Sequence, residues 1–281
     1  MGEADFAYDA SAPLEPLPRR IVSLAPGLTL SLFELNLGSR LVAVTDRCTE
    51  PPAGVARLPR VGDPHAPDRA RIVDLRPDLV LARADDNRVE DVRALKDAGL
   101  AVWYARVRTA RDAVSLLWDI MKALDEASMV PRVRLIDRTL DYVEGAARNV
   151  KASAVFASVG PDPWRTFNKE TYAHDLLRVC GGRNVFADRE ARFFSVTQAE
   201  VEAAQPGVVL LPGDATPDAV ATIQALDIPA ARSGRVHCVA GNLLTWPGTR
   251  LAQAMDVLPP LLMPGATTGN RALAAGQPER G

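Results

Sequence analysis

The sequence is poor in the residues that most often carry chemistry or cross-links. Its 281 residues include three cysteines and three histidines, and aromatic residues make up 5%. The cysteines are odd in number and far apart, at Cys48, Cys180 and Cys238, so no disulfide framework is expected. No two histidines stand at helical spacing, which argues against a closed zinc site. We therefore expect no closed zinc site and assign no residue as a metal ligand.

The short motifs of common catalytic and nucleotide-binding sites are also missing. The chain contains no G-x-S-x-G, no G-x-x-x-x-G-K-[ST] and no G-x-G-x-x-G. No combination of nucleophile, base and oxyanion donor is visible, so we predict that the protein is not an enzyme. The net charge is −2, with both signs interspersed. This balance gives no reason to expect binding to nucleic acid.

No apolar run is long enough to span a membrane, and residues 1–18 lack the basic and apolar regions of a signal peptide. We therefore expect no membrane insertion and a location in the cytoplasm. If a leader was removed, the protein would instead be periplasmic or lipid-anchored. Residues 1–18 and 263–281 are rich in Pro, Gly, Ala and charge. This composition predicts a disordered head and a disordered tail.

What remains between these ends alternates short β-branched runs with helical stretches, which is typical of an α/β fold. The segments 71–82 and 200–212 repeat one pattern, in which a helix is followed by a proline and an apolar strand. This repetition indicates two similar α/β lobes.

The longest helical pattern stands between the two halves. Apolar residues from Val133 to Ala147 recur at steps of three and four, as on one face of a helix. We expect an N-terminal lobe over 19–126, a long rigid bridging helix over 127–149 and a C-terminal lobe over 150–262. Clefts between domains are where ligands usually bind, so the ligand is expected between the lobes.

Polar residues follow the predicted strand Leu79–Ala82 after two positions. Asp85, Asp86 and Asn87 stand where the strand has ended and a helix begins. Ligands approach open α/β sheets at this edge, but an Asp or Asn there also caps the next helix. We assign the cap to Asp86 or Asn87, and we place Asp85 and Arg88 in the cleft.

The few aromatic residues of the second half fall in predicted loops. They are Trp164, Phe193, Phe194 and Trp246. An apolar ring in a loop either covers a ligand or fixes the loop to its lobe. Because three such loops come from one lobe, we place Phe193, Phe194 and Trp246 in the cleft and Trp164 at its rim.

Two loop residues of the first half are candidates for metal or cofactor chemistry. Cys48 follows the second predicted strand, where its thiolate would suit a soft metal, although an inert small thiol is equally expected there. His65 lies in the proline-flanked loop GDPHAPD, where a purely structural role is the alternative. Cys180 and Cys238 belong to apolar patterns and are expected to be buried.

Three ordered motifs resemble the helical-backbone substrate-binding proteins, the group that includes cobalamin- and ferric-siderophore-binding components of ABC importers. They are RIVSLAPGLTLSLFELNLGSRLVAVTDRCTEPP, LPRVGDPHAPDRARIVDLRPDLVLA and HDLLRVCGGRNVFAD. The resemblance covers about residues 19–260 and implies two α/β lobes bridged by one rigid helix. The stretches DDNRVEDVRALKDAGLAVW and DPWRTFNKETYAHDLL are most similar to a leaderless subgroup, often described as helical backbone metal receptors.

The resemblance also carries expectations about the cleft. The subgroup tends to have Cys-x-His-Pro after the second strand, whereas this chain has Glu50 in place of the histidine, so that pair is not expected to ligate a metal. Phe193 aligns with an aromatic residue of the cobalamin pocket. Arg47 and Pro64 stand where that pocket has aromatic residues, which implies a more polar cleft on the first lobe.

The chain also differs from the importer-type members of the family at the positions that contact the permease. Importer-type members carry a glutamate on each lobe that docks onto arginines of the permease. The aligned positions here are Ala70 and Ala199, and the nearby Asp68 and Glu200 would point differently on their helices. We therefore do not expect docking on a permease.

Together these features predict a monomeric, non-enzymatic binding protein for a corrinoid, haem-like or metal-chelate ligand in the interlobe cleft, not coupled to a transporter. The candidate ligand is cobalamin or another metal chelate, with Arg47, Arg88 and Arg165 available for its acid groups. One alternative is a cytoplasmic enzyme or chaperone that handles a cofactor through Cys48 and His65. Others are a periplasmic cobalamin or iron-chelate importer component, and a protein whose cleft is filled by its own side chains.

Overall fold

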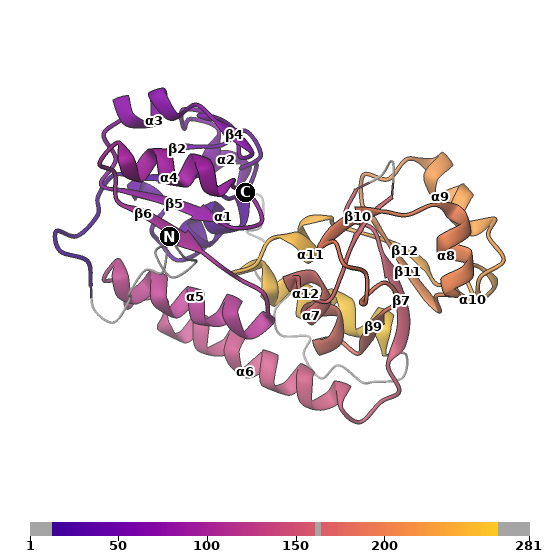
Figure 1. Cartoon of the computed structure of the whole chain (residues 1–281). Helices are drawn as coiled ribbons and strands as arrows, with labels where there is room; N and C mark the ends of the chain where they lie inside the picture. Colours follow the sequence, from indigo (N-terminus) through magenta and orange to yellow (C-terminus); the bar gives the residue numbers. More distant parts are fainter. Residues whose placement is uncertain (1–12, 161–163, 264–281) are drawn as a thin grey trace, which may run out of the picture.

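The computed structural model describes residues 13–160 and 164–263, which form two α/β lobes side by side (Figure 1). Most of the predicted disordered head and tail lies outside these residues. Two residues that we assigned to those ends are packed on the lobes. The Leu14 N–H donates to the Ala123 carbonyl (2.9 Å), and Met263 is only 4% exposed.

The first lobe is built on a four-stranded parallel sheet with the order β2-β1-β5-β6. Its strands are β1 (Ile21–Ser23), β2 (Leu41–Val44), β5 (Leu79–Arg83) and β6 (Val102–Ala105), with a short hairpin of β3 (Gly62–Asp63) and β4 (Ala66–Pro67). Its helices are α1 (Pro26–Glu34), η2 (Gly38–Arg40), α2 (Pro52–Val55), α3 (Arg69–Asp74), α4 (Val89–Asp97) and α5 (Ala110–Ala123). All residues of β5 are buried, which explains its continuous apolar run.

The second lobe repeats this topology with a parallel sheet of order β12-β11-β7-β9. Its strands are β7 (Ser153–Ala157), β9 (Gly182–Asn184), β11 (Val208–Pro212) and β12 (Val236–Val239), and β8 (Arg165–Phe167) pairs with β10 (Phe193–Ser195) in a separate antiparallel sheet. Its helices are α7 (Tyr172–Val179), α8 (Gln198–Ala204), α9 (Pro217–Gln224), α10 (Pro229–Arg232), α11 (Asn242–Thr245) and α12 (Arg250–Leu262). In each lobe the four parallel strands, numbered along the chain, follow the order 2-1-3-4, so the prediction of two similar α/β lobes is confirmed.

The two lobes are bridged by α6 (Val130–Ala147), which runs beneath both of them (Figure 1). Its apolar stripe is buried, as the spacing predicts, and consists of Val133, Ile136, Leu140 and Val143. At about 1.5 Å per residue, 18 residues span about 27 Å. No helix among the described residues has the length and apolar character that a membrane crossing requires.

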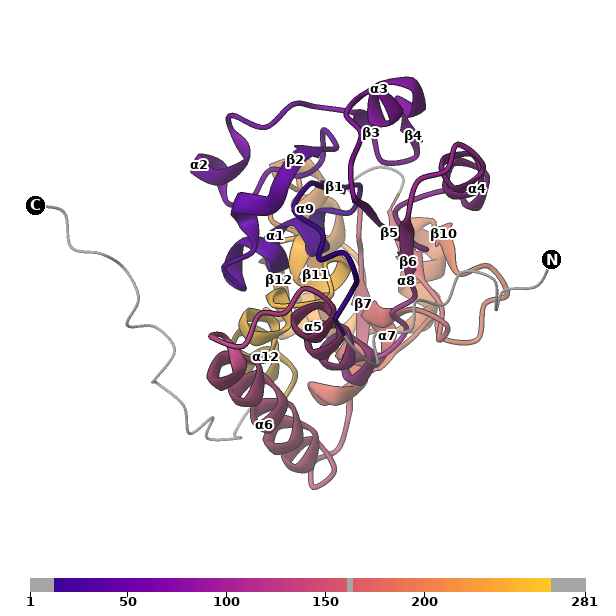
Figure 2. The same ribbon diagram turned by 90° about the vertical axis from the view of Figure 1, so that its left-hand side faces the viewer.

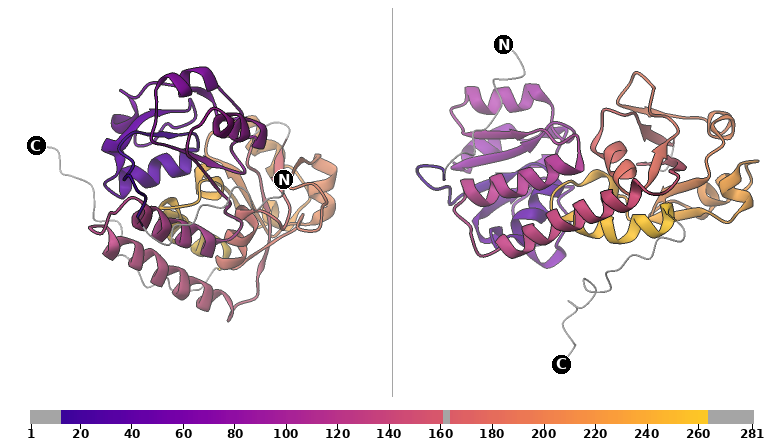
Figure 3. Two further views of the ribbon diagram at one scale, coloured as in Figure 1. Left: turned by 60° about the vertical axis from the view of Figure 1, so that its left-hand side comes forward. Right: turned by 90° about the horizontal axis from the view of Figure 1, so that it is seen from below.

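A second tie between the lobes comes from the C-terminal segment, which the sequence patterns did not indicate. α12 packs beside α6, and the segment before α12 contacts α1 of the first lobe (Figures 2 and 3). There the Thr249 N–H donates to Ser31 Oγ (3.2 Å). Gly248 has a positive φ of 108°, and a Cβ at this position would lie 2.3 Å from Ser31 Oγ. Only glycine fits this close approach.

One further detail corrects an expectation about the cysteines. Cys180 is buried as expected, whereas Cys238 is exposed. The reason is that Cys238 belongs to β12, an edge strand of the second sheet.

Candidate ligand-binding site

A cavity of about 280 Å³ lies between the two lobes. It opens at the ends of parallel strands in both sheets, the place where ligands approach open α/β sheets. Its first-lobe lining is Pro26, Arg47, His65, Arg83, Asp85 and Asp86. Its second-lobe lining includes Val159, Arg165, Tyr172, Phe193, Leu244 and Trp246.

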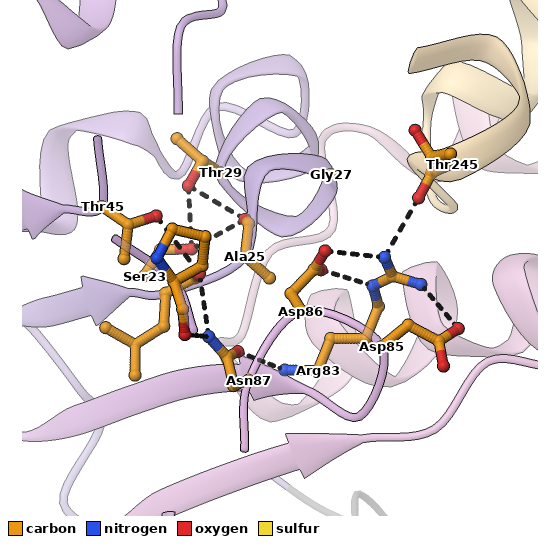
Figure 4. Close-up of polar contacts among 12 residues, drawn as sticks. Ser23, Ala25, Gly27, Thr29, Thr45, Arg83, Asp85, Asp86, Asn87 and Thr245 are labelled. Carbon is orange, nitrogen blue, oxygen red and sulfur yellow. Dashed lines mark hydrogen bonds and ion pairs between the residues drawn. The ribbon is translucent and has the colours of Figure 1, made fainter. Parts of the chain in front are cut away.

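The charged floor of the cavity is organised by Arg83, the last residue of β5 (Figure 4). Arg83 donates twice to Asp86, from Nε (2.6 Å) and Nη2 (2.9 Å), and once to Asp85 (3.3 Å). Nη2 also donates to the Thr245 carbonyl of the second lobe (3.0 Å). Burial alone would lower the pKa of Arg83, but the two carboxylates raise it above its ordinary value. The guanidinium therefore stays charged and links both lobes.

The polar residues after β5, Asp85 to Asn87, thus shape the edge of the cavity and do not cap the next helix. α4 begins after Arg88, and no side chain caps it, so assigning the cap to Asp86 or Asn87 was wrong. Asn87 instead accepts from the Arg83 N–H (2.9 Å) and donates to the carbonyls of Leu24 (3.2 Å) and Pro64 (2.9 Å). It thereby fixes three loops at the sheet edge.

Asp85 and Arg88, both expected in the cleft, lie in different places. Asp85 lines the cavity. The Arg88 guanidinium is directed to Asp91, with Nε 2.9 Å from its carboxylate, and Arg88 is absent from the cavity lining. Placing Arg88 in the cleft was therefore wrong, because the Asp91 carboxylate in the first turn of α4 holds the Arg88 guanidinium on the outer surface.

Of the four aromatic candidates, Phe193 and Trp246 line the cavity, whereas Phe194 and Trp164 do not. Phe193 and Phe194 are neighbours in β10, and successive strand residues point to opposite faces. Phe194 packs edge-to-face on Phe186 with ring centroids 6.2 Å apart. Trp164, 9% exposed, belongs to the same core cluster of the second lobe. Both rings hold loops on the lobe and do not meet the cavity.

Cations flank the two rings that do line the cavity. The Arg165 guanidinium lies 5.4 Å from the Phe193 ring centroid, and that of Arg250 lies 5.8 Å from Trp246. Arg165 is exposed and makes no ion pair with a described residue. Its charge is therefore available to an acid group of a ligand.

The first-lobe loop residues are arranged around Asp63. Its carboxylate accepts from Arg47 Nε (3.1 Å) and from the His65 N–H (2.8 Å). Burial would raise the pKa of Asp63, but these hydrogen bonds and the charge of Arg47 lower it. Arg47 and His65 both line the cavity from this loop.

Cys48 is away from the cavity and fully buried in the core. Thr29 Oγ1 donates to its sulfur (3.0 Å), and Thr45 Oγ1 lies 3.2 Å from it. Burial raises the pKa of the thiol, so the thiolate form is disfavoured. The inert alternative therefore describes Cys48, and its inclusion among ligand-binding residues was wrong. Across residues 13–160 and 164–263, no group of three or more His, Cys, Asp or Glu is placed to hold a metal ion.

Three residues that line the cavity were not predicted from the sequence to do so: Arg83, Asp86 and Tyr172. Tyr172 is 2% exposed, and its hydroxyl makes no hydrogen bond to a described residue, although it lines the cavity. Burial raises its pKa, so the hydroxyl remains protonated and can donate. Arg83 had one signal, a charged residue directly after an apolar run. Tyr172 had none, since it opens an ordinary amphipathic helix.

No family model matches the chain, but sequence comparison finds relatives along most of its length. An uncharacterized ABC transporter substrate-binding lipoprotein of Bacillus subtilis (strain 168) is 27% identical over 274 residues, which cover 92% of this chain and 85% of the relative. A vitamin B12-binding protein of Pectobacterium carotovorum subsp. carotovorum (strain PC1) is 26% identical over 213 residues, covering 74% and 75% of the two chains.

Solved structures share the two-lobed architecture. The periplasmic vitamin B12-binding protein BtuF of Vibrio cholerae superposes with a TM-score of 0.76 at 21% identity, over 87% of this chain and 96% of that one. The periplasmic heme-binding protein BhuT, solved in complex with two hemes, superposes with a TM-score of 0.71 at 25% identity, over 86% and 97%. The architecture predicted from the sequence is therefore confirmed.

Proposed function

Because this chain is a sequence relative of the helical-backbone substrate-binding proteins and has their fold, we propose that it binds a metal-chelate ligand between its lobes and delivers it to an ABC importer. The interlobe cavity carries the proposal. Phe193 and Trp246 line it together with Arg165, Arg83 and the Tyr172 hydroxyl. Aromatic rings suit the apolar face of a macrocycle, and arginines suit the acid groups at its edge.

The ligand class is a corrinoid, a haem or another iron chelate. Relatives named as vitamin B12-binding proteins and a fold neighbour solved with two hemes support this class. The cavity of about 280 Å³ is at the small end of ligand cavities, which are about 300–1,000 Å³. A macrocycle would therefore be held by one edge and one face, with the rest outside the cavity.

The names of the relatives change two of the sequence-based expectations. One relative is named a lipoprotein and one fold neighbour periplasmic, which speaks against a cytoplasmic protein. The first relative is also named an ABC transporter substrate-binding protein, which favours the importer alternative over a function without a transporter. The protein proposed here is therefore a binding component outside the cytoplasmic membrane that delivers its ligand to a permease, and its monomeric state stays a prediction.

The remaining alternatives fit the described residues less well. A cofactor-handling enzyme or chaperone that uses Cys48 and His65 would need both side chains at one site. Only His65 lines the cavity, and the Cys48 thiol is buried elsewhere. A cleft filled by the protein's own side chains would leave no cavity of about 280 Å³. The relatives are named as binding proteins, which agrees with a function other than catalysis.

Titrations followed by absorbance test the proposal. Cyanocobalamin, haem and a ferric siderophore should be added separately to the purified protein, and native mass spectrometry of freshly purified protein should identify any ligand already bound. We expect saturable one-site binding of at least one of the three chelates at micromolar concentration or below, as for a specific cleft. Absence of binding for all three, with a folded protein, would exclude the proposed ligand class.

A further inference from the structure

A second cavity of about 200 Å³ lies on the other side of Asp85, and we infer that it is a binding site for an oxyanion, a carboxylate or a phosphate group. Asp85 lines both cavities, so its side chain stands between them. The other lining residues are Ala84, Tyr104, Arg106, Val107, Arg108 and Arg192. The inference does not depend on the proposed chelate ligand, because the site is defined by its own residues.

Three arginines from the two lobes meet around this cavity. Arg106 and Arg108 follow β6 in the first lobe, whereas Arg192 precedes β10 in the second. Asp85 is the one carboxylate in the lining, and it already pairs with Arg83. Arg108 and Arg192 bring positive charge to the lining from both lobes, which favours an anion over a cation or an apolar ligand.

The Asp112 carboxylate, next to Arg108 in space, lies outside the cavity lining. It accepts from the backbone N–H groups of Arg108 (2.9 Å) and Thr109 (3.0 Å), where it completes the capping box of α5.

Arg192 supplies the most specific sign of a missing acceptor. Its Nη2 lies 2.8 Å from Asp85 Oδ1 and donates to the Glu170 carbonyl (3.2 Å). Its Nε is buried and has no partner among the described residues. Buried N–H donors are almost always paired, and arginine N–H groups pair best with carboxylate or phosphate oxygens. An oxyanion in this cavity would satisfy Nε and share Arg192 with Asp85.

The oxyanion that this site binds can come from two sources. One source is a free inorganic anion. The other is an acid group of a chelate in the main cavity, reaching past Asp85. Either source places negative charge against arginines of both lobes and adds a further contact between them.

Calorimetric titration with inorganic phosphate, in a chloride-free buffer of low ionic strength, tests the site. Arg108→Gln should weaken phosphate binding by about tenfold. Arg134→Gln, which removes the same charge from the exposed side of α6, should leave it unchanged. Asp85→Asn should strengthen binding several-fold, because it removes the carboxylate that competes for Arg192. No heat of binding, or equal effects of Arg108→Gln and Arg134→Gln, would overturn the inference.

A second titration separates the two sources. Haem should be titrated into the protein with and without saturating phosphate. Competition would assign the site to an acid group of the chelate, whereas independent binding would assign it to a free anion. Because the phosphate titration needs no chelate, a failure of the proposed function would show only in the haem arm.

Discussion

At the scale of single residues, Phe193 and Phe194 offer a matched pair, since they are neighbours in β10 with opposite surroundings. Phe193 lines the cavity, and Phe194 packs on Phe186 in the lobe core. Phe193→Ala should weaken chelate binding by about 1–3 kcal/mol with little loss of stability. Phe194→Ala should lower the free energy of unfolding by about 2 kcal/mol and leave the affinity nearly unchanged. Absorbance titration and urea unfolding of both variants check this. A sharp loss of stability in Phe193→Ala without loss of affinity would make that ring a core residue.

Tyr172 is a second residue whose role can be isolated. Its hydroxyl is buried and has no hydrogen-bond partner within residues 13–160 and 164–263, an arrangement that costs about 1–3 kcal/mol when nothing satisfies the group. Tyr172→Phe should therefore leave the stability of the ligand-free protein equal or raise it by about 1 kcal/mol, while chelate affinity falls by about 1 kcal/mol. Urea unfolding and the absorbance titration measure the two quantities. If the variant is less stable, the hydroxyl has a structural partner such as a bound water, and its assignment to the ligand fails.

At the scale of elements, the contact between α1 and the segment before α12 should be the contact between the lobes that tolerates added side-chain volume least. Gly248→Ala places a methyl group 2.3 Å from Ser31 Oγ at a φ of +108°. We expect it to lower the free energy of unfolding by more than about 2 kcal/mol, through steric overlap and backbone strain. Gly99→Ala is the control, since its φ is +84° and no non-neighbouring atom of the described part of the chain lies within 4 Å of the added Cβ. It should cost about 1 kcal/mol, from the backbone alone. If urea unfolding gives equal losses of unfolding free energy for the two variants, the contact of Gly248 with Ser31 has room for a methyl group.

The elements also show what the sequence could predict. Buried parallel strands such as β5 and the stripe of α6 are local patterns, so their residues identify them directly. β8 and β10 have three residues each, too few for a period to appear, and without β10 the opposite directions of Phe193 and Phe194 could not be inferred. The bonds of Asn87 to Leu24 and Pro64 join loops 63 and 23 positions apart. Only the folded chain brings these partners together.

At the scale of the whole molecule, the two lobes should move little when a ligand binds. α6 is one rigid connection, and the contact of Thr249 with Ser31 is another. Asn242 also donates to Glu50 across the lobes (2.6 Å). Large hinge closure needs a few flexible connecting residues that absorb the rotation, and these ties oppose it. Small-angle scattering with and without the bound chelate should give the same radius of gyration within error. A clear decrease would mean that the lobes close as a hinge.

Under the proposed function, the molecule has to dock on an importer permease. The resemblance implies one glutamate per lobe for docking, whereas Ala70 of α3 and Ala199 of α8 occupy those positions and are exposed. Asp68 cannot replace the first glutamate freely, because it caps α3 by accepting from the Arg71 N–H (3.0 Å). Glu200 is held in the capping box of α8 and by Arg189. Neither Asp68 nor Glu200 is therefore free to act as the docking carboxylate of its lobe.

Restoring the two carboxylates should strengthen docking. Exposed charge pairs at the rim of an interface act mainly on the association rate, and they fade as salt rises. The double variant Ala70→Glu, Ala199→Glu should bind the cognate importer permease more tightly, by about 1–3 kcal/mol at low salt and less at physiological salt. Ala70→Gln, Ala199→Gln is the control of equal size without charge. Pull-down of the permease in detergent, with all three proteins compared, measures the effect. If the Glu and Gln variants bind alike, the docking surface lies elsewhere on the lobes. If the unmodified protein captures no permease at any salt concentration, the importer function itself is wrong.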